Sequence, residues 1–75
     1  MTEKFFEDLE HVLVQYIGPI APYIIDDSLA DLGEVKENFN VEKIPILIEA
    51  LSQEITDDKK RAEFQKDMLS RIKNI

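Results

Sequence analysis

Histidine, the residue type that most often transfers protons in enzymes, occurs once in the 75-residue chain, at position 11. It stands among Glu7, Asp8 and Glu10, on what would be the polar side of an amphipathic helix. A general base needs an orienting partner and a cleft, and an exposed helix face offers neither. Cysteine is absent, which excludes thiolate nucleophiles and thiolate metal ligands. We therefore predict that the protein is not an enzyme, with no catalytic residue, no metal site and no cofactor.

Three aspartates, Asp26, Asp27 and Asp31, gather toward the end of the second expected helix. Carboxylates bind hard cations, but the spacing lacks the Asp-x-Asp-x-Asp-Gly pattern of a calcium loop. We interpret the three as an exposed acidic face that could meet a basic partner. A second acidic stretch, residues 56–58 (Thr-Asp-Asp), is typical of a helix start, because acids favour the positive end of a helix.

The tripeptide Asp27-Ser28-Leu29 resembles the prosthetic-group site of acyl carrier proteins, which are small acidic helical chains. In that family the serine opens a helix and carries phosphopantetheine. Here Ser28 falls inside an apolar-periodic segment, and the Ala-Asp-Leu-Gly that follows is a pattern that stops a helix. A small acidic carrier or ligand-binding helical bundle, with Ser28 as the carrier serine, is therefore the alternative function and not the favoured one.

The net charge of −7 is distributed unevenly. Residues 1–34 hold eight acids and one base, whereas residues 35–75 hold eight acids and eight bases. Nucleic acids and anionic membranes need a positive surface, so we expect neither as a partner. An acidic surface suits a basic protein partner, although it also serves solubility alone. No apolar run approaches the length of a membrane span and no signal peptide is visible, so we expect a cytoplasmic location.

The stretch Tyr16-Ile17-Gly18-Pro19-Ile20-Ala21-Pro22 joins two apolar helical patterns, expected at about residues 2–16 and 19–32. Glycine suits the left-handed position that ends a helix, and proline suits the first turn of the next one. We predict a rigid corner here, and its structural motif consists of Tyr16, Gly18, Pro19, Ile20 and Ala21.

Two more helices are predicted, over about residues 41–55 and 57–73, and no segment alternates long enough to be a strand. Asn40 could cap the third helix. Pro45 would cost on the order of 3 kcal/mol deep inside a helix, so the helix either begins later than Asn40 or has irregular first turns. The predicted fold is all-α, a compact four-helix bundle with short connections, in one domain over residues 1–75.

Apolar periodicity predicts which side chains form the core and which apolar side chains lie outside it. Val35 and Phe39 are expected to anchor a polar loop between the second and third helices. Val14 and Ile46 fall off the apolar stripes of their helices. If they gather on the surface they would mark an interface, and with the three aspartates above they are the predicted interface residues. The expected core consists of Phe5, Leu9, Leu13, Tyr16, Ile20, Ile24, Leu29, Ile44, Leu47, Ile48, Leu51, Ile55, Phe64, Met68 and Ile72.

The order of these segments resembles a small all-helical accessory domain found at the C-terminal end of bacterial Ser/Thr protein kinases and other signalling proteins. The resemblance lies in the Tyr-Ile-Gly-Pro-Ile-Ala corner, the Leu-Ile-Glu-Ala-Leu-Ser-Gln-Glu-Ile helix and the final helix with Phe64. It implies a non-catalytic protein-interaction or regulatory module in bacterial cytoplasmic signalling, and it supplies no ligand residues. The expected partner is a protein, basic in character, and a second copy that forms a homodimer is the other option.

Overall fold

The structure, a computed structural model, describes residues 2–72. No strand occurs within these residues, so the prediction of an all-α fold is confirmed. In chain order the elements are α1 (Thr2–Ile17), the 3-10 turn η1 (Gly18–Ile20), α2 (Ala21–Asp31), the 3-10 turns η2 (Lys36–Asn38) and η3 (Val41–Lys43), α3 (Ile44–Ser52) and α4 (Asp58–Ile72).

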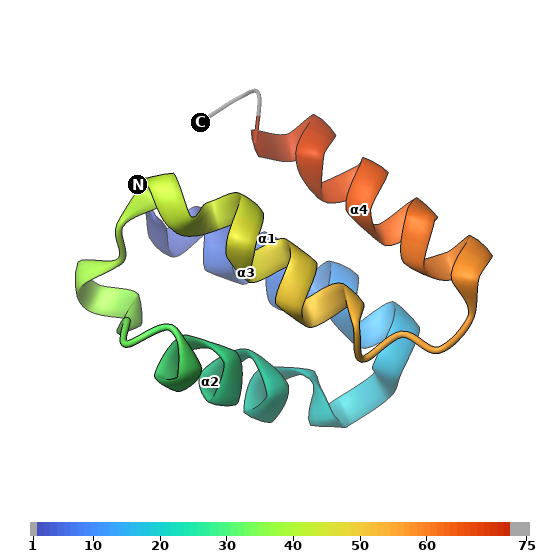
Figure 1. Ribbon diagram of the computed structural model, residues 1–75, viewed down its shortest axis with the longest axis horizontal. Helices are drawn as coiled ribbons and strands as arrows, with labels where there is room; N and C mark the ends of the chain where they lie inside the picture. The colour runs from blue at the N-terminus through green and yellow to red at the C-terminus, as the bar shows by residue number, and fades with distance from the viewer. Residues whose placement is uncertain (1, 73–75) are drawn as a thin grey trace.

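The helices surround one apolar core (Figure 1). α1 contacts α2 and α4, and α3 contacts the same two helices. Figure 1 shows α3 in front of α1, with each helix running opposite to the one before it. The prediction of a compact four-helix bundle with short connections is confirmed only in part. α3 spans only 9 residues, and the connection from α2 to α3 extends over residues 32–43.

The corner between α1 and α2 has the predicted backbone. Gly18 has a φ of 77°, a left-handed conformation that costs glycine little and other residues more, so α1 ends there. Pro19 lies in the first turn of η1, and Pro22 lies in the first turn of α2. The backbone N–H of Ala21 donates to the carbonyl of Gly18, which closes the 3-10 turn between the two helices.

The 3-10 turn also changes which face of α2 is buried. Ala21, Ile25 and Leu29 point into the core at a spacing of four residues. The prediction that Ile20 is a core residue is wrong, because its side chain is 52% exposed. A 3-10 turn advances fewer residues per turn than an α-helix, so a side chain in η1 does not continue the α-helical stripe that follows it.

The end of α2 is fixed by a Schellman motif. Gly33 has a φ of 70°, its N–H donates to the carbonyl of Ala30 at 3.1 Å, and the N–H of Glu34 donates to the carbonyl of Leu29 at 2.9 Å. Both bonds satisfy carbonyls that the last turn of a helix leaves without partners. The stop that the sequence predicts at Gly33 is confirmed.

The start of α3 resolves the problem that Pro45 poses. The Oδ1 atom of Asn40 accepts from the N–H of Glu42 at 3.0 Å, so Asn40 caps a helical segment as predicted. That segment is the 3-10 turn η3, and the α-helix begins only at Ile44, with Pro45 in its first turn. The predicted helix over 41–55 is therefore too long at both ends, and Val41, its first predicted residue, is 50% exposed.

The final helix begins one residue later than predicted. The Oδ1 atom of Asp57 accepts from the N–H of Lys60 at 3.0 Å, which makes Asp57 the N-cap and Asp58 the first helical residue. The predicted end at Lys73 lies outside the described residues. Phe64 and Met68 lie on the side of α4 that faces the core, whereas the neighbouring Leu69 is 50% exposed.

The core otherwise follows the predicted stripes. Tyr16, Ile24 and Ile72 pack against its edge and are only partly buried. Of the loop anchors, Phe39 is buried and Val35 is exposed. The expected core side chains that are buried are Phe5, Leu9, Leu13, Leu29, Ile44, Leu47, Ile48, Leu51, Ile55, Phe64 and Met68. The core also takes in Phe6, Val12, Ala21, Ile25 and Phe39.

Candidate functional site

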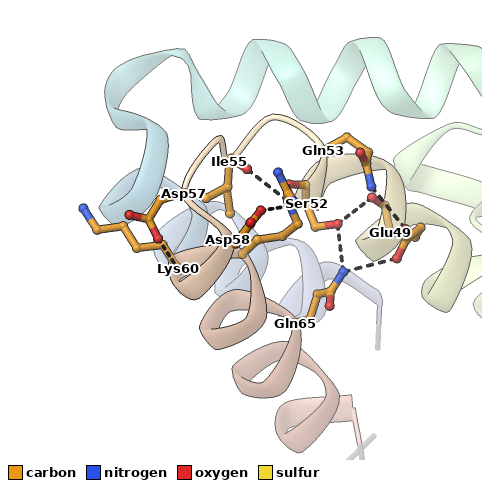
Figure 2. Close-up of polar contacts among 9 residues, drawn as sticks. Glu49, Ser52, Gln53, Ile55, Asp57, Asp58, Lys60 and Gln65 are labelled. Atoms are coloured by element: carbon orange, nitrogen blue, oxygen red, sulfur yellow. Dashed lines mark hydrogen bonds and ion pairs between the residues drawn. The ribbon is translucent and has the colours of Figure 1, made fainter.

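A cluster of polar side chains joins the end of α3 to α4 (Figure 2). Ser52 is fully buried; its Oγ donates to the carbonyl of Glu49 at 2.7 Å and accepts from Nε2 of Gln65 at 2.9 Å. The same Gln65 nitrogen lies 3.2 Å from Oε2 of Glu49, whose other oxygen accepts from Nε2 of Gln53 at 3.2 Å. The hydroxyl of Ser52 is thus satisfied on both sides.

Arg61 completes this joint from the first turn of α4. Its Nε donates to the carbonyl of Ser52 at 3.2 Å and to the carbonyl of Ile55 at 3.1 Å, and one terminal nitrogen donates to Oδ1 of Asp58 at 2.9 Å. Ser52 is the last residue of α3 and Ile55 lies in the segment that follows it, where carbonyls lack the partners that they would have inside a helix. The guanidinium therefore ties the two helices together.

The joint has a structural character and not a catalytic one. A serine nucleophile needs an adjacent base, whereas the Ser52 hydroxyl donates to a backbone carbonyl. His11, the one histidine of the chain, lies on α1 and is exposed. Within residues 2–72, no three carboxylate or histidine side chains converge in a way that could hold a metal ion.

The residues that the sequence singled out on α2 do not converge either. Asp26, Asp27 and Asp31 are exposed, and the carboxylate of Asp26 lies 3.6 Å from Nζ of Lys36. Ser28 is half-buried inside α2 and does not open a helix. This placement lacks the feature on which the carrier alternative depends, although the function of Ser28 stays a prediction.

An acidic groove lies between α1 and η2. Its volume is about 410 Å³, and its lining consists of Glu3, Phe6, Glu7, Glu10, Lys36 and Glu37. The three α1 glutamates are spaced at i, i+4 and i+7 and so share one helix face. Within residues 2–72, the glutamates of this groove form no ion pair. We take this acidic groove as the candidate functional site.

Lys36 covers the apolar part of the acidic groove. Its Nζ lies 5.9 Å from the centre of the Phe6 ring, within reach of a cation–π interaction, and it also pairs with Asp26. Phe6 in turn packs edge-on against Phe39, with ring centres 5.3 Å apart. Burial of Phe39 thus fixes η2 beside α1 and brings Glu37 to the groove.

A second surface, here called the α2 outer face, is made of Ile20, Tyr23, Asp27 and Ala30. Tyr23 is 70% exposed, and Ile20, Asp27 and Ala30 are exposed as well. Tyr23, Asp27 and Ala30 are spaced at i, i+4 and i+7 and therefore lie along one side of α2, whereas Ile20 precedes the helix in η1. The sequence prediction missed the apolar half of this face, because it assigned Ile20 to the core.

The remaining predicted interface residues do not form one patch. Val14 is 40% exposed and Ile46 is 54% exposed, as their positions off the apolar stripes predict. They belong to α1 and α3, which lie across the core from each other. Each is therefore a single exposed apolar side chain, which is common on protein surfaces.

Tyr16, the first residue of the corner motif, links α1 to α4. Its ring packs edge-on against Phe64, with centres 5.8 Å apart. Burial raises the pKa of its hydroxyl, and the nearby carboxylates of Glu63 and Asp67 raise it further. The Tyr16 hydroxyl is therefore neutral near neutral pH.

Comparisons with known proteins give one match. The family model described as "Domain of unknown function (DUF8082)" matches residues 4–75. No curated protein and no solved structure gives a significant match. No helix in the described part of the chain is long and apolar enough to cross a membrane.

Proposed function

The chain belongs to the family described as "Domain of unknown function (DUF8082)", and we propose that it is a non-catalytic protein-interaction module in bacterial cytoplasmic signalling. In this proposal its helices act as a small four-helix bundle that presents a rigid surface. The acidic groove between α1 and η2 receives a basic segment of a protein partner. The observation that carries the proposal is the set of groove glutamates without ion pairs in residues 2–72.

The charge distribution supports a basic partner. All the excess negative charge of the chain falls in residues 1–34, and α1, which belongs to this part, supplies three of the groove glutamates. Opposite charges on two surfaces accelerate encounter and select against partners of the wrong charge. Exposed ion pairs are each weak, however, so we expect a transient complex that is sensitive to salt.

The acidic groove also has the parts to hold a cationic side chain. Lys36 already places its ammonium group against the Phe6 ring, so a lysine or arginine of a partner would pair with the groove glutamates and not with that ring. The signalling role itself rests on the resemblance of the corner and the helices to accessory domains of signalling proteins. The cytoplasmic location rests on that resemblance as well.

The test is binding of a short fluorescent peptide of alternating lysine and alanine, measured by fluorescence anisotropy. We expect Glu7→Gln/Glu10→Gln to weaken binding about three- to tenfold, the effect of losing two exposed charge pairs. Added salt should weaken the wild-type complex and reduce the difference between wild type and variant.

The matched control is Glu42→Gln/Glu54→Gln, which changes the net charge by the same amount at exposed positions outside the groove. Equal weakening by both double variants would show that only net charge matters, and the groove would then not be the binding site. A peptide that binds neither wild type nor control would likewise overturn the proposal.

A further inference from the structure

We propose that the α2 outer face is a second docking surface, separate from the acidic groove, and that it binds an amphipathic helix of a partner protein. The helix would carry a stripe of apolar side chains flanked by lysine or arginine. This inference goes beyond the proposed function, because none of the four residues of the α2 outer face lines the acidic groove. The hollow at the end of the face shares only Lys36 and Glu37 with that groove.

The first support is apolar exposure at the N-terminal half of the face. Ile20 is 52% exposed and Tyr23 is 70% exposed, and the two are three residues apart in the chain. A single exposed apolar side chain needs no explanation, but two large ones this close in the chain are typical of the apolar surface found at interfaces. Tyrosine is also among the residues that most often dominate binding energy.

The second support is the shape at the other end of the face. Ala30 borders a hollow of about 350 Å³ whose wall combines the apolar Leu29 and Val35 with charged side chains, namely Asp26, Glu34, Lys36 and Glu37, and Val35 is 57% exposed. The distance from Ile20 to Ala30 along a helix is about 15 Å. That length matches about three turns of a partner helix, with its last apolar side chain directed toward the hollow.

The third support is charge, which indicates what kind of partner the α2 outer face would bind. Asp27 and Asp31 are exposed beside the apolar positions, and neither forms an ion pair within residues 2–72. A basic flank on the partner would complement both. A second copy of α2 would not, because antiparallel pairing places these aspartates against Ile20 and Tyr23, and parallel pairing places aspartate against aspartate.

The experiment titrates the full 75-residue chain, labelled with ¹⁵N, with a designed helical peptide that has leucine on one stripe and lysine beside it. We expect amide shifts concentrated at Ile20, Tyr23, Asp27 and Ala30. A peptide of the same composition, with its leucines spread around the helix, is the control and should give no localised shifts. Shifts centred on α3 and α4, or none with the designed peptide, would overturn the proposal.

Two variants test the face at the level of side chains. Tyr23→Ala should weaken binding of the designed peptide about tenfold, whereas Leu69→Ala, an equally simple truncation of an exposed residue on α4, should leave it unchanged. Asp27→Asn/Asp31→Asn should weaken binding and reduce its salt dependence. All of these positions are exposed, so the variants are expected to fold, which circular dichroism checks.

The groove variant Glu7→Gln/Glu10→Gln separates this proposal from the previous one. It should leave binding of the designed peptide at the α2 outer face unchanged, whatever its effect on the lysine–alanine peptide. If it abolishes binding of both peptides, the α2 outer face is not an independent site. Self-association is tested by light scattering at several concentrations. If wild type forms a concentration-dependent dimer and Tyr23→Ala does not, the face serves self-association and the proposal is overturned.

Discussion

Glu34 holds the connection between α2 and α3 in place through both of its carboxylate oxygens. Oε1 accepts from the N–H of Asn40 at 2.9 Å, and Oε2 lies 3.1 Å from Nζ of Lys43. The same Lys43 nitrogen donates to the carbonyl of Leu32 at 3.3 Å. One carboxylate and one ammonium therefore close a connection whose apolar contacts with the core come from Leu32 and Phe39.

These contacts give a testable dependence on pH. The backbone N–H of Asn40 and the Lys43 ammonium lower the pKa of Glu34 below its usual value of 4.5. A lowered pKa means that the folded state favours the ionised carboxylate of Glu34. The stabilisation is therefore complete above the usual pKa of the unfolded state. It is lost as the pH falls through the lowered pKa of the folded state. Glu34→Gln should therefore destabilise the protein near neutral pH, and its difference from wild type should shrink in acid.

Urea unfolding at a series of pH values measures this difference in the free energy of unfolding. Glu54→Gln is the control, because it removes an exposed carboxylate that forms no hydrogen bond within residues 2–72. A Glu34→Gln difference that stays constant from neutral pH to acid would show that the ionised form has no special role in this connection.

At the scale of single residues, the residues that begin or end helices are the ones that the sequence predicts best. Gly18, Gly33 and Asn40 each end or begin a helical segment where their residue types indicate. Such residues act on backbone groups one to four positions away, so the information is local. Arg61 could not be found in this way, since its acceptors are the carbonyls of Ser52 and Ile55, and only the turn between α3 and α4 brings them to it.

At the scale of elements, the joint between α3 and α4 depends on the shape of the Arg61 guanidinium. A lysine keeps the charge but has a single donor group and cannot reproduce the fork that reaches two carbonyls and Asp58. Arg61→Lys should lower the free energy of unfolding by about 1–2 kcal/mol, the range for hydrogen bonds from a charged and partly exposed donor.

The measurement is the midpoint of urea unfolding, and Lys60→Ala is the matched control. Lys60 neighbours Arg61 and is exposed, and only its backbone N–H contributes to the Asp57 cap. We expect the control to stay within about 0.5 kcal/mol of wild type. Equal midpoints for Arg61→Lys and wild type would mean that the joint is held by packing and by Gln65 alone.

Two errors in the predicted elements have a common cause. Both η1 and η3 are 3-10 turns beside a proline in the following turn. The sequence predicts α-helix from residue 19, whereas at the start of the third helix Pro45 leaves a later start or irregular first turns open. Periodicity at 3.6 residues per turn places Ile20 and Val41 on the core face, whereas the tighter turn leaves both exposed. Apolar patterns alone do not distinguish the two kinds of turn.

At the scale of the whole molecule, stability depends on a small core. Phe64 is fully buried and contacts Tyr16 of α1. Replacing a buried phenylalanine by alanine costs about 3–5 kcal/mol, and a domain of this length has only about 4–11 kcal/mol in total. We therefore expect Phe64→Ala to be largely unfolded or close to it, as measured by circular dichroism during thermal and urea unfolding.

Leu69→Ala is the control on the same helix, because Leu69 is 50% exposed and its loss leaves no buried cavity. Its unfolding midpoint should lie close to that of wild type. If the two variants lost the same amount of stability, the side of α4 assigned to the core would be wrong.

The sequence by itself determined the helical class, the helix-ending residues, most of the core and the acidic character of the first 34 residues. These properties follow from residue types and from spacings within a few turns, which act locally along the chain. The tertiary structure alone decided where surfaces form: Phe39 brings Glu37 to α1, and the turn at η1 exposes Ile20 beside Tyr23. Contacts between residues far apart in the chain depend on how the helices pack, and packing is set by the whole core at once.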